Sequence, residues 1–154
     1  MVSVFIDKKA TLFDQFLLQP LFVSARIARV LVEKQVSQPI RKLLYVAESD
    51  GIVKGFQTIE PFGAYTPAFD HVGIIGTFVG LSFQKQGIGK TLFQASFTAA
   101  RAKGFEKLFA FVRSDNTAGL RAYLGQGFEQ VGIAKKHAKI DGKYIDQIFI
   151  ERFL

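Results

Sequence analysis

Apolar and polar positions follow two different periods along the chain, and each change of period marks a new element. Apolar runs that are continuous or alternate at every second position predict β-strands over residues 2–6, 43–48, 52–59, 71–81, 107–112, 128–139 and 144–153. Apolar residues that recur every three or four positions predict helices over residues 11–18, a segment after Pro20, 88–103 and 117–125. This order predicts one domain over residues 1–154, a mixed α/β (α+β) sheet of about seven strands with helices after strands one, four and five.

Two of the predicted helices carry an apolar stripe that we expect to face the core. In the segment after Pro20 the stripe consists of Val23, Ile27, Val30 and Leu31. In the helix over residues 88–103 it consists of Ile88, Leu92, Ala95 and Ala99. Such stripes are typical of helices that pack on a sheet.

Glycines indicate how the elements are joined. Asp50-Gly51 and Asp141-Gly142 each separate two β-prone runs by two residues, which predicts tight hairpins. A Gly-Phe pair follows two of the predicted helices, at residues 104–105 and 127–128, and predicts a left-handed C-terminal cap at each. The glycines within residues 71–81 predict a β-bulge or a close backbone approach in that strand, and residues 60–70 are expected to form a loop.

Composition excludes several classes of protein and site. No apolar run approaches the ~18 residues that a membrane span requires. The N-terminus lacks the basic and apolar regions of a secretory signal, so a cytoplasmic location is expected. The chain has no cysteine and only two histidines, His71 and His137, and we therefore predict no disulfide, no thiol nucleophile and no metal site.

The net charge of +7 is unevenly distributed along the chain. Residues 1–84 hold 8 Lys/Arg and 7 Asp/Glu, a balance of +1, whereas residues 85–154 hold 12 and 6, a balance of +6. This excess indicates a solvated basic surface, an anionic cofactor or a nucleic acid. Because the basic residues are mostly spaced singly, the pattern argues against the nucleic-acid interpretation.

A glycine-bearing turn lies between a predicted strand and a predicted helix, at residues 84–91. Such a turn directs backbone N–H groups and the positive end of a helix dipole at one point, which suits a phosphate. A Walker-A loop would need glycine at Gln84, and a dinucleotide fingerprint would need glycine at Leu92. Both motifs therefore fail at a specific residue.

The turn resembles the pyrophosphate-binding motif of the GNAT superfamily of N-acetyltransferases, Arg/Gln-x-x-Gly-x-Gly/Ala, here Gln84-x-x-Gly87-x-Gly89. The order of the surrounding parts is similar as well, because Asn116 follows strand five and Tyr123 precedes the Gly-Phe that opens strand six. The resemblance covers about residues 43–152 and implies a GNAT-type fold with acetyl-CoA (coenzyme A) as cofactor. The implied cofactor-binding residues are Phe78, Val79, Gln84, Lys85, Gln86, Gly87, Ile88, Gly89, Lys90, Thr91 and Asn116.

The reaction that the resemblance implies is acetyl transfer from acetyl-CoA to a primary amine by direct attack in a ternary complex. Tyr123 is then the candidate catalytic acid that protonates the departing sulfur, although a packing tyrosine would give the same sequence. Asn116 contacts the cofactor or caps the following helix, since asparagine is a favoured N-cap. Lys85 and Lys90 pair with phosphate or are simply solvated.

The general base and the acceptor are not evident from the sequence. Many members of the resembling family carry a glutamate on strand four, but residues 73–81 contain no acid. Glu60, Asp70 and His71 flank this strand, and we assign none of them as the base. The missing acid leaves a noncatalytic acyl-CoA-binding module as the alternative function. Aromatic residues in 61–70 are expected to wall an apolar acceptor pocket or to form a homodimer contact.

Overall fold

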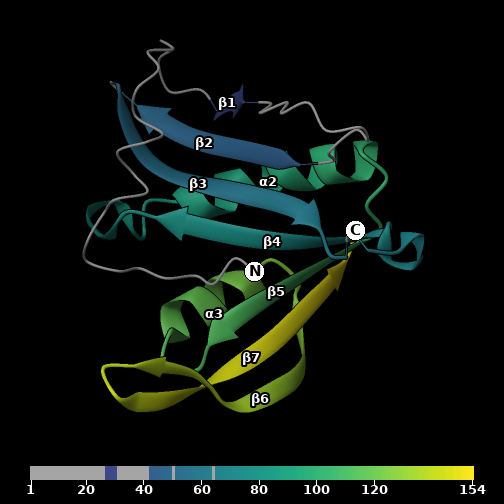
Figure 1. The fold of residues 1–154 in the computed structure, drawn as a ribbon. Coiled ribbons are helices and arrows are strands. Elements are labelled where there is room, and N and C mark those ends of the chain that lie inside the picture. Colours follow the sequence, from purple (N-terminus) through teal and green to yellow (C-terminus); the bar gives the residue numbers. More distant parts are fainter. Residues whose placement is uncertain (1–26, 31–41, 50, 64) are drawn as a thin grey trace.

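The computed structural model describes residues 27–30, 42–49, 51–63 and 65–154, which form one seven-stranded mixed sheet in the order β1-β2-β3-β4-β5-β7-β6 (Figure 1). The strands are β1 (Ile27–Val30), β2 (Leu43–Ser49), β3 (Ile52–Pro61), β4 (Val72–Val79), β5 (Lys107–Arg113), β6 (Glu129–Ile140) and β7 (Lys143–Phe153). The helices are α2 (Ile88–Ala102) and α3 (Thr117–Leu124), with short 3₁₀ turns η1 (Pro67–Phe69) and η2 (Leu81–Phe83). The predicted strand over residues 2–6 and helix over 11–18 lie outside the described residues.

Strand β1 corrects one sequence prediction. Residues 27–30 were expected in the second amphipathic helix, but they pair antiparallel with β2, with Ile27 opposite Ala47 and Val30 opposite Leu44. Two of these four residues are β-branched, and the edge of β2 offers backbone partners that outweigh a weak local helical preference. The rest of that predicted helix lies outside the described residues.

Both predicted hairpins are confirmed. Ser49 pairs with Ile52 across the first turn, where Gly51 has a φ of 74°. Ile140 pairs with Lys143 across the second turn, where Asp141 and Gly142 both have positive φ (48° and 78°). Positive φ at both central residues is typical of the type I′ turn, whose twist matches that of the two strands.

The two predicted glycine caps are also confirmed. Gly104 and Gly127 have φ values of 81° and 79°. After the first glycine, the Phe105 N–H donates to the Ala100 carbonyl (3.0 Å), and after the second the Phe128 N–H donates to the Tyr123 carbonyl (3.3 Å). Each phenylalanine ring is buried beside the helix that it terminates, which fixes where β5 and β6 begin.

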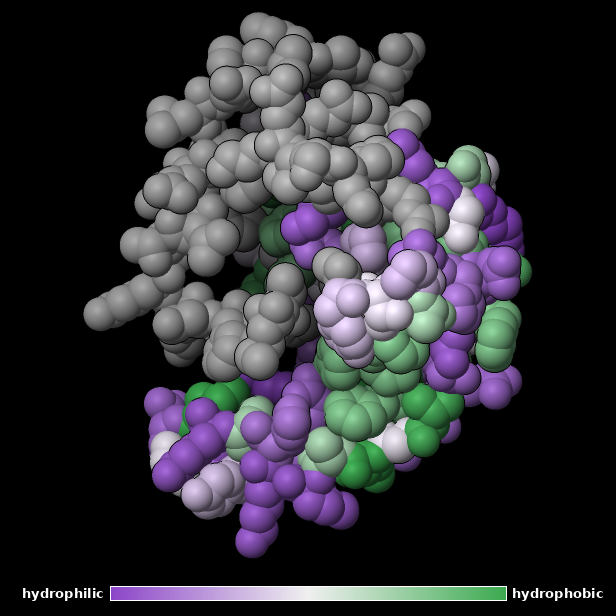
Figure 2. Space-filling view, turned by 45° about the vertical axis from the view of Figure 1, so that its right-hand side comes forward, coloured by the Kyte–Doolittle hydropathy of each residue, from purple (hydrophilic) through white to green (hydrophobic). Residues whose placement is uncertain are grey.

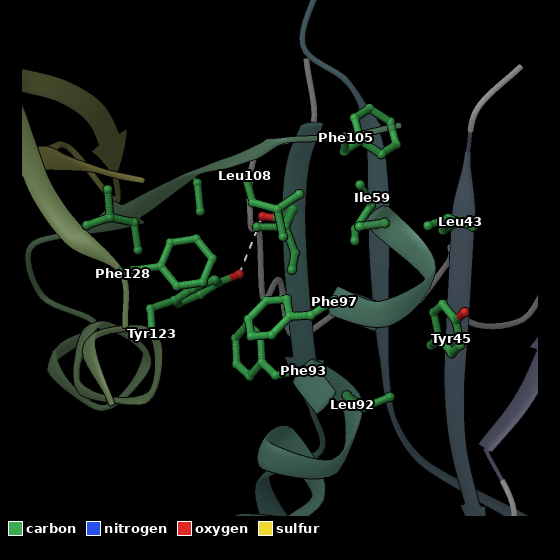
Figure 3. Close-up of a cluster of buried hydrophobic side chains, with 14 of the residues drawn as sticks. Leu43, Tyr45, Ile59, Leu92, Phe93, Phe97, Phe105, Leu108, Tyr123 and Phe128 are labelled. Atoms are coloured by element: carbon green, nitrogen blue, oxygen red, sulfur yellow. Dashed lines mark hydrogen bonds between the residues drawn. The ribbon is translucent and has the colours of Figure 1, made fainter. Parts of the chain in front are cut away.

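The core lies where α2 covers one face of the sheet over β2, β3 and β4. The buried residues of α2 are Leu92, Phe93, Ser96, Phe97 and Ala100. Of the stripe predicted for this helix only Leu92 is fully buried, while its other members pack at the margin of the core. Phe93 of α2 makes an edge-on contact with Tyr123 of α3 (5.1 Å between ring centroids) and a tilted contact with Phe128, just before β6 (6.1 Å) (Figure 3).

Strand β4 pairs with β3 in continuous register from Gly73 to Val79, so the bulge predicted for β4 is not present. The irregularity lies instead between β2 and β3, at the step from Ala47 to Glu48. The predicted close backbone approach is found at Gly73, where a Cβ would lie 2.9 Å from Ile59 Cγ2 and 3.0 Å from Leu108 Cδ2. Glycine at this position lets the core pack directly against the strand backbone.

Strands β4 and β5 pair over only three residues each, from Val72–Ile74 to Lys107–Phe109. Beyond Ile74, β4 continues beside β3 while β5 continues beside β7, so the two strands diverge toward their carboxyl ends (Figure 1). Among the described residues the facing edges of the divergent halves have no strand between them. The sheet therefore contains a splayed junction at its centre.

Strand β6 lies at the end of the described sheet and contains a bulge. Its register with β7 shifts between Ala134 and Ala138, which pair with Gln147 and Ile145. Asp146 holds the bulge: one of its oxygens accepts from the Lys136 N–H (2.8 Å) and the other from Lys135 Nζ (2.9 Å). These hydrogen bonds, led by that from the Lys136 N–H, lower the pKa of the Asp146 carboxyl.

Candidate functional site

The N-terminus of α2 lies just beyond the carboxyl end of β4 and is open to an external ligand. Gly87 is the N-cap in a left-handed conformation (φ 80°), and no side chain among the described residues caps the helix. The first helical hydrogen bond runs from the Thr91 N–H to the Gly87 carbonyl (3.0 Å). The N–H groups of the first turn therefore have no partner within the helix, and the positive end of the helix dipole adds to their attraction for an anion.

The space above this turn is empty of protein atoms in the described part of the chain. A Cβ added at Gly87 or at Gly89 would meet nothing within 4 Å. Lys85 and Lys90 are exposed on either side, and the first turn of α2 contains no acidic residue. We call this turn, with its backbone amides and two exposed lysines, the amide cradle, and it is suited to a phosphate group.

The other predicted residues of the turn shape this cradle. Gln84 is exposed and ends η2. Gln86 Nε2 donates to the Ser82 carbonyl (3.2 Å), and Thr91 Oγ1 donates to the Gly87 carbonyl (3.2 Å), so both side chains hold the backbone of the turn. Ile88 packs against the edge of the core and anchors the first turn of α2.

Phe78 and Val79 lie at the carboxyl end of β4, within its divergent half. The Phe78 ring stacks on Phe56 of β3, with centroids 4.5 Å apart. Val79 lies opposite Gly55 in the same strand pair. Both residues thus sit on the edge strand of the splayed junction, between Ile74 and the glycine turn.

Tyr123 of α3 reaches from the other side of the junction to the same strand. Its side chain is buried among the aromatic residues of the core (Figure 3). Its hydroxyl lies 3.0 Å from Thr77 Oγ1 and 3.4 Å from the Ile75 carbonyl. Burial raises the pKa of Tyr123 to about 12, and the hydrogen bonds with Thr77 oppose that rise. The phenol is therefore protonated at neutral pH, which is the state that a proton donor requires.

This raised pKa makes an alkaline-stability prediction. Between the ordinary pKa of 10.0 and the folded pKa of about 12 the unfolded chain loses the Tyr123 proton while the folded chain keeps it. The contribution of this pKa difference to the free energy of unfolding is therefore present in full below pH 10 and is lost as the pH rises toward 12. Urea unfolding should show that the free energy of unfolding falls between pH 9 and pH 11 by about 1 kcal/mol more in the wild type than in Tyr123→Phe. Equal losses in the two proteins would contradict the assigned burial of the phenol.

Asn116 is the N-cap of α3, and its Oδ1 accepts from the Gly119 N–H (3.0 Å). Of the two interpretations of Asn116, helix capping is thus present in the structure. A second helix N-terminus follows the carboxyl end of β5, as α2 follows that of β4. The two divergent strands therefore lead to the glycine turn on one side and to Asn116 on the other.

Two polar residues near Tyr123 were not singled out in the sequence. Thr77 lies on β4, and Gln57 lies opposite it on β3 and is fully buried. The only sequence signal for Gln57 is its position two residues before Ile59, because alternate residues of a strand lie on the same face. Phe56 and Ile52 are apolar residues of the opposite face, so the pattern of β3 does not identify its buried face.

The three groups considered as a base do not form a site with Tyr123. Glu60 Oε2 forms an ion pair with Lys42 Nζ (3.0 Å). His71 is exposed and precedes β4, and Asp70 is exposed at the end of η1. Both lie before Val72, where β4 and β5 are still paired, at the opposite end of β4 from the glycine turn.

The aromatic residues of the loop before β4 form a surface hollow of about 270 Å³. Its lining includes Phe62 and Phe69, whose rings are 5.5 Å apart, together with Phe109 of β5. Tyr65 adds an exposed ring against Phe69. Hydrophobic residues also gather on the described surface in the space-filling view, with hydrophilic residues around them (Figure 2).

The described residues contain no group of three or more His, Asp or Glu side chains placed to hold a metal ion. None of their helices is long and apolar enough to cross a membrane.

Comparison with known proteins places this geometry among acetyltransferases. Residues 14–128 match the model of the acetyltransferase (GNAT) family. The N-alpha-acetyltransferase RimI of Mycobacterium tuberculosis is 33% identical over 97 residues, which are 62% of this chain and 58% of that protein.

Solved structures share the fold. The crystal structure of ribosomal-protein-alanine N-acetyltransferase from Brucella melitensis superposes with a TM-score of 0.69 at 28% identity, over 73% of this chain and 69% of that one. A GNAT superfamily phosphinothricin acetyltransferase from Sinorhizobium meliloti, solved in complex with acetyl-CoA, gives 0.68 at 24% identity, over 73% and 61%.

Proposed function

The chain belongs to the acetyltransferase (GNAT) family, and we propose that it is an N-acetyltransferase that moves an acetyl group from acetyl-CoA to a primary amine. The observation that carries this proposal is the junction between β4 and β5, bordered by an amide cradle on one side and by a protonated, buried tyrosine on the other. Relatives and structural neighbours named as N-acetyltransferases support it.

The cradle fits the phosphates of coenzyme A. The unpartnered amides at the start of α2 and the open space over Gly87 and Gly89 accommodate a pyrophosphate, and Lys85 and Lys90 supply positive charge. Gln86 and Thr91 keep the turn in shape through their bonds to backbone carbonyls. The Oδ1 of Asn116 caps α3, so its Nδ2 is the group that would reach the cofactor.

The divergent edge of β4 fits the pantetheine arm. This arm carries two amide groups and can pair with an unpartnered strand edge as an added strand does. The edge near Phe78 and Val79 leads from the cradle toward Tyr123. Residues on β4 would then orient the thioester while the cradle holds the nucleotide end.

Acetyl-CoA would supply the reactive thioester, and this chain's residues would hold it beside the amine. As the amine nitrogen bonds to the acetyl carbon and the carbon–sulfur bond breaks, Tyr123 would donate its hydroxyl proton to the departing sulfur, for which its protonated state at neutral pH is suited. The proton that the nitrogen gives up would pass through solvent and restore the neutral phenol. Holding donor and acceptor in one junction supplies much of the rate by proximity. The hollow lined by Phe62, Phe69 and Phe109 lies at the paired start of β4 and β5, so it is our candidate only for a part of the acceptor site distant from the glycine turn.

The direct test is release of free thiol from acetyl-CoA with a panel of amines. We expect release that depends on both the protein and a primary amine, with equimolar acetylated amine by mass spectrometry. Tight binding of acetyl-CoA without turnover on any amine would instead favour a noncatalytic acyl-CoA-binding module.

Ligand protection provides a prediction that does not depend on the acceptor. Coenzyme A should raise the free energy of unfolding by about 2.7 kcal/mol at a hundred times its dissociation constant, because it binds only the folded state. The thermal unfolding midpoint should rise accordingly. ATP and NAD, which lack the pantetheine arm, should protect much less at equal concentration. Equal protection by ATP in differential scanning fluorimetry would argue for a general nucleotide site.

A further inference from the structure

Gln57, Thr77 and Tyr123 form a polar row beside the splayed junction, in which Gln57 and Tyr123 are buried and Thr77 is half-buried. Gln57 Nε2 donates to Thr77 Oγ1 at 2.7 Å, and the hydroxyl groups of Thr77 and Tyr123 are 3.0 Å apart. The row crosses from β3 through β4 to α3, so it spans the splayed junction. Its last member also reaches the Ile75 carbonyl at 3.4 Å.

Gln57 is a costly residue at this position. Its side chain is fully buried, and its Oε1 has no hydrogen-bond partner among the described residues. A buried carbonyl without a partner destabilises the folded state, whereas an apolar side chain of similar shape would remove that cost. The one bond that the Gln57 amide makes here is the bond to Thr77, which indicates that this bond is the reason for the glutamine.

The bond from Gln57 also determines what the Thr77 hydroxyl can do. A threonine hydroxyl has one hydrogen and two lone pairs. Because the Gln57 amide occupies one lone pair, the Thr77 hydroxyl is held in place and is left to exchange a hydrogen bond with Tyr123. It can accept from the neutral phenol, and it can donate to the phenolate that remains once the proton has left.

We propose that Thr77 and Gln57 are positioning residues for Tyr123. Gln57 fixes the Thr77 hydroxyl, and Thr77 holds the Tyr123 oxygen at the divergent edge of β4 and stabilises it after proton transfer. This inference rests on the proposed function, and it assigns to the two side chains a role in the rate rather than in cofactor binding.

The first test compares Thr77→Val with Thr77→Ser in thiol-release kinetics. Valine keeps the shape and removes the hydroxyl, so kcat should fall about tenfold or more while KM for acetyl-CoA stays within a few-fold. Serine keeps the hydroxyl and should recover most of kcat. Thr58→Val is the matched control, because Thr58 lies on β3 opposite Gly76 and outside the row, and its kcat should not change.

The second test uses Gln57→Met, which keeps the length of the side chain and removes both polar atoms. We expect an unchanged or higher thermal unfolding midpoint together with a lower kcat. A glutamine that serves only the packing of the core gives the opposite result, a lower midpoint and an unchanged kcat, which would overturn the inference.

The third test separates this inference from the proposed function. If Thr77 acts through Tyr123, the double variant Thr77→Val/Tyr123→Phe should be no slower than Tyr123→Phe alone. Additive losses, or full kcat in Thr77→Val, would overturn the positioning role and leave the acetyltransferase proposal intact. A wild-type protein that releases no thiol with any amine would overturn both.

Discussion

Replacing Gly89 by valine is expected to abolish measurable acetyl-CoA binding while the protein keeps its stability. Gly89 lies in the first turn of α2, and a side chain there would enter the open space that we assign to the pyrophosphate. Nothing in the described structure lies within 4 Å of the added Cβ, and valine is a slightly better helix former than glycine. Titration calorimetry should show at least a hundredfold weaker binding, with an unchanged or higher unfolding midpoint.

Gly87→Val should abolish binding as well, but it is a less clean probe. Gly87 has a φ of 80°, so any side chain adds backbone strain of roughly 1–2 kcal/mol. Gly142→Val is the matched control, because Gly142 has a φ of 78°, is equally unobstructed and lies in the distant β6–β7 hairpin. It should lose similar stability and bind acetyl-CoA normally. Unchanged affinity in Gly89→Val would remove the cradle as the phosphate site.

Tyr123→Phe should lower kcat by roughly 10²- to 10⁴-fold, the range of a positioned general acid. A coenzyme A thiolate leaves fairly easily without help, so we expect the lower end. The loss should appear in kcat rather than in KM, because the proton is transferred only in the transition state. Steady-state thiol release with any accepted amine measures both constants.

Controls for Tyr123→Phe follow from its packing. The phenylalanine ring keeps the contacts with Phe93 and Phe128, so the fold should lose only the contribution of one buried hydrogen-bonded hydroxyl, about 1 kcal/mol. Tyr144→Phe is the matched control, since Tyr144 is 60% exposed on β7. It should change neither stability nor rate. Full turnover in Tyr123→Phe would assign this residue to packing alone.

Features that depend on a few adjacent residues were predictable from the sequence. The Asp-Gly hairpins and the Gly-Phe helix caps need particular φ values that few residue types adopt, so the residues identify them. The helix over residues 88–103 was located from its apolar stripe and from Gly104 after it, and the turn before it from its glycines. Tyr123 was identified from the family resemblance, by its place before Gly127-Phe128, and the structure places its hydroxyl against β4.

Features that depend on distant partners were not predictable. Residues 27–30 have helical spacing but pair with β2, because an available strand edge outweighs a short periodic pattern. The buried face of α2 includes Phe93 and Phe97 rather than Ala95 and Ala99 of the predicted stripe, which reflects the rings of Tyr123 in α3 and of Phe128 just before β6. The polar row from Gln57 to Tyr123 joins residues 66 positions apart, from 57 to 123, and only the folded sheet brings them together.

The bulge in β6 has a consequence for how copies of this protein meet in solution. An outermost strand with a straight row of free amides and carbonyls invites a strand of a second molecule and so promotes aggregation. Here Lys136 adopts a φ of 53° and Asp146 fastens the displaced backbone, which interrupts that row. Lys136 adds a positive charge at the same edge, and a second copy paired there would bring the same charge close to it. The edge is thereby protected against growth of the sheet into a fibre.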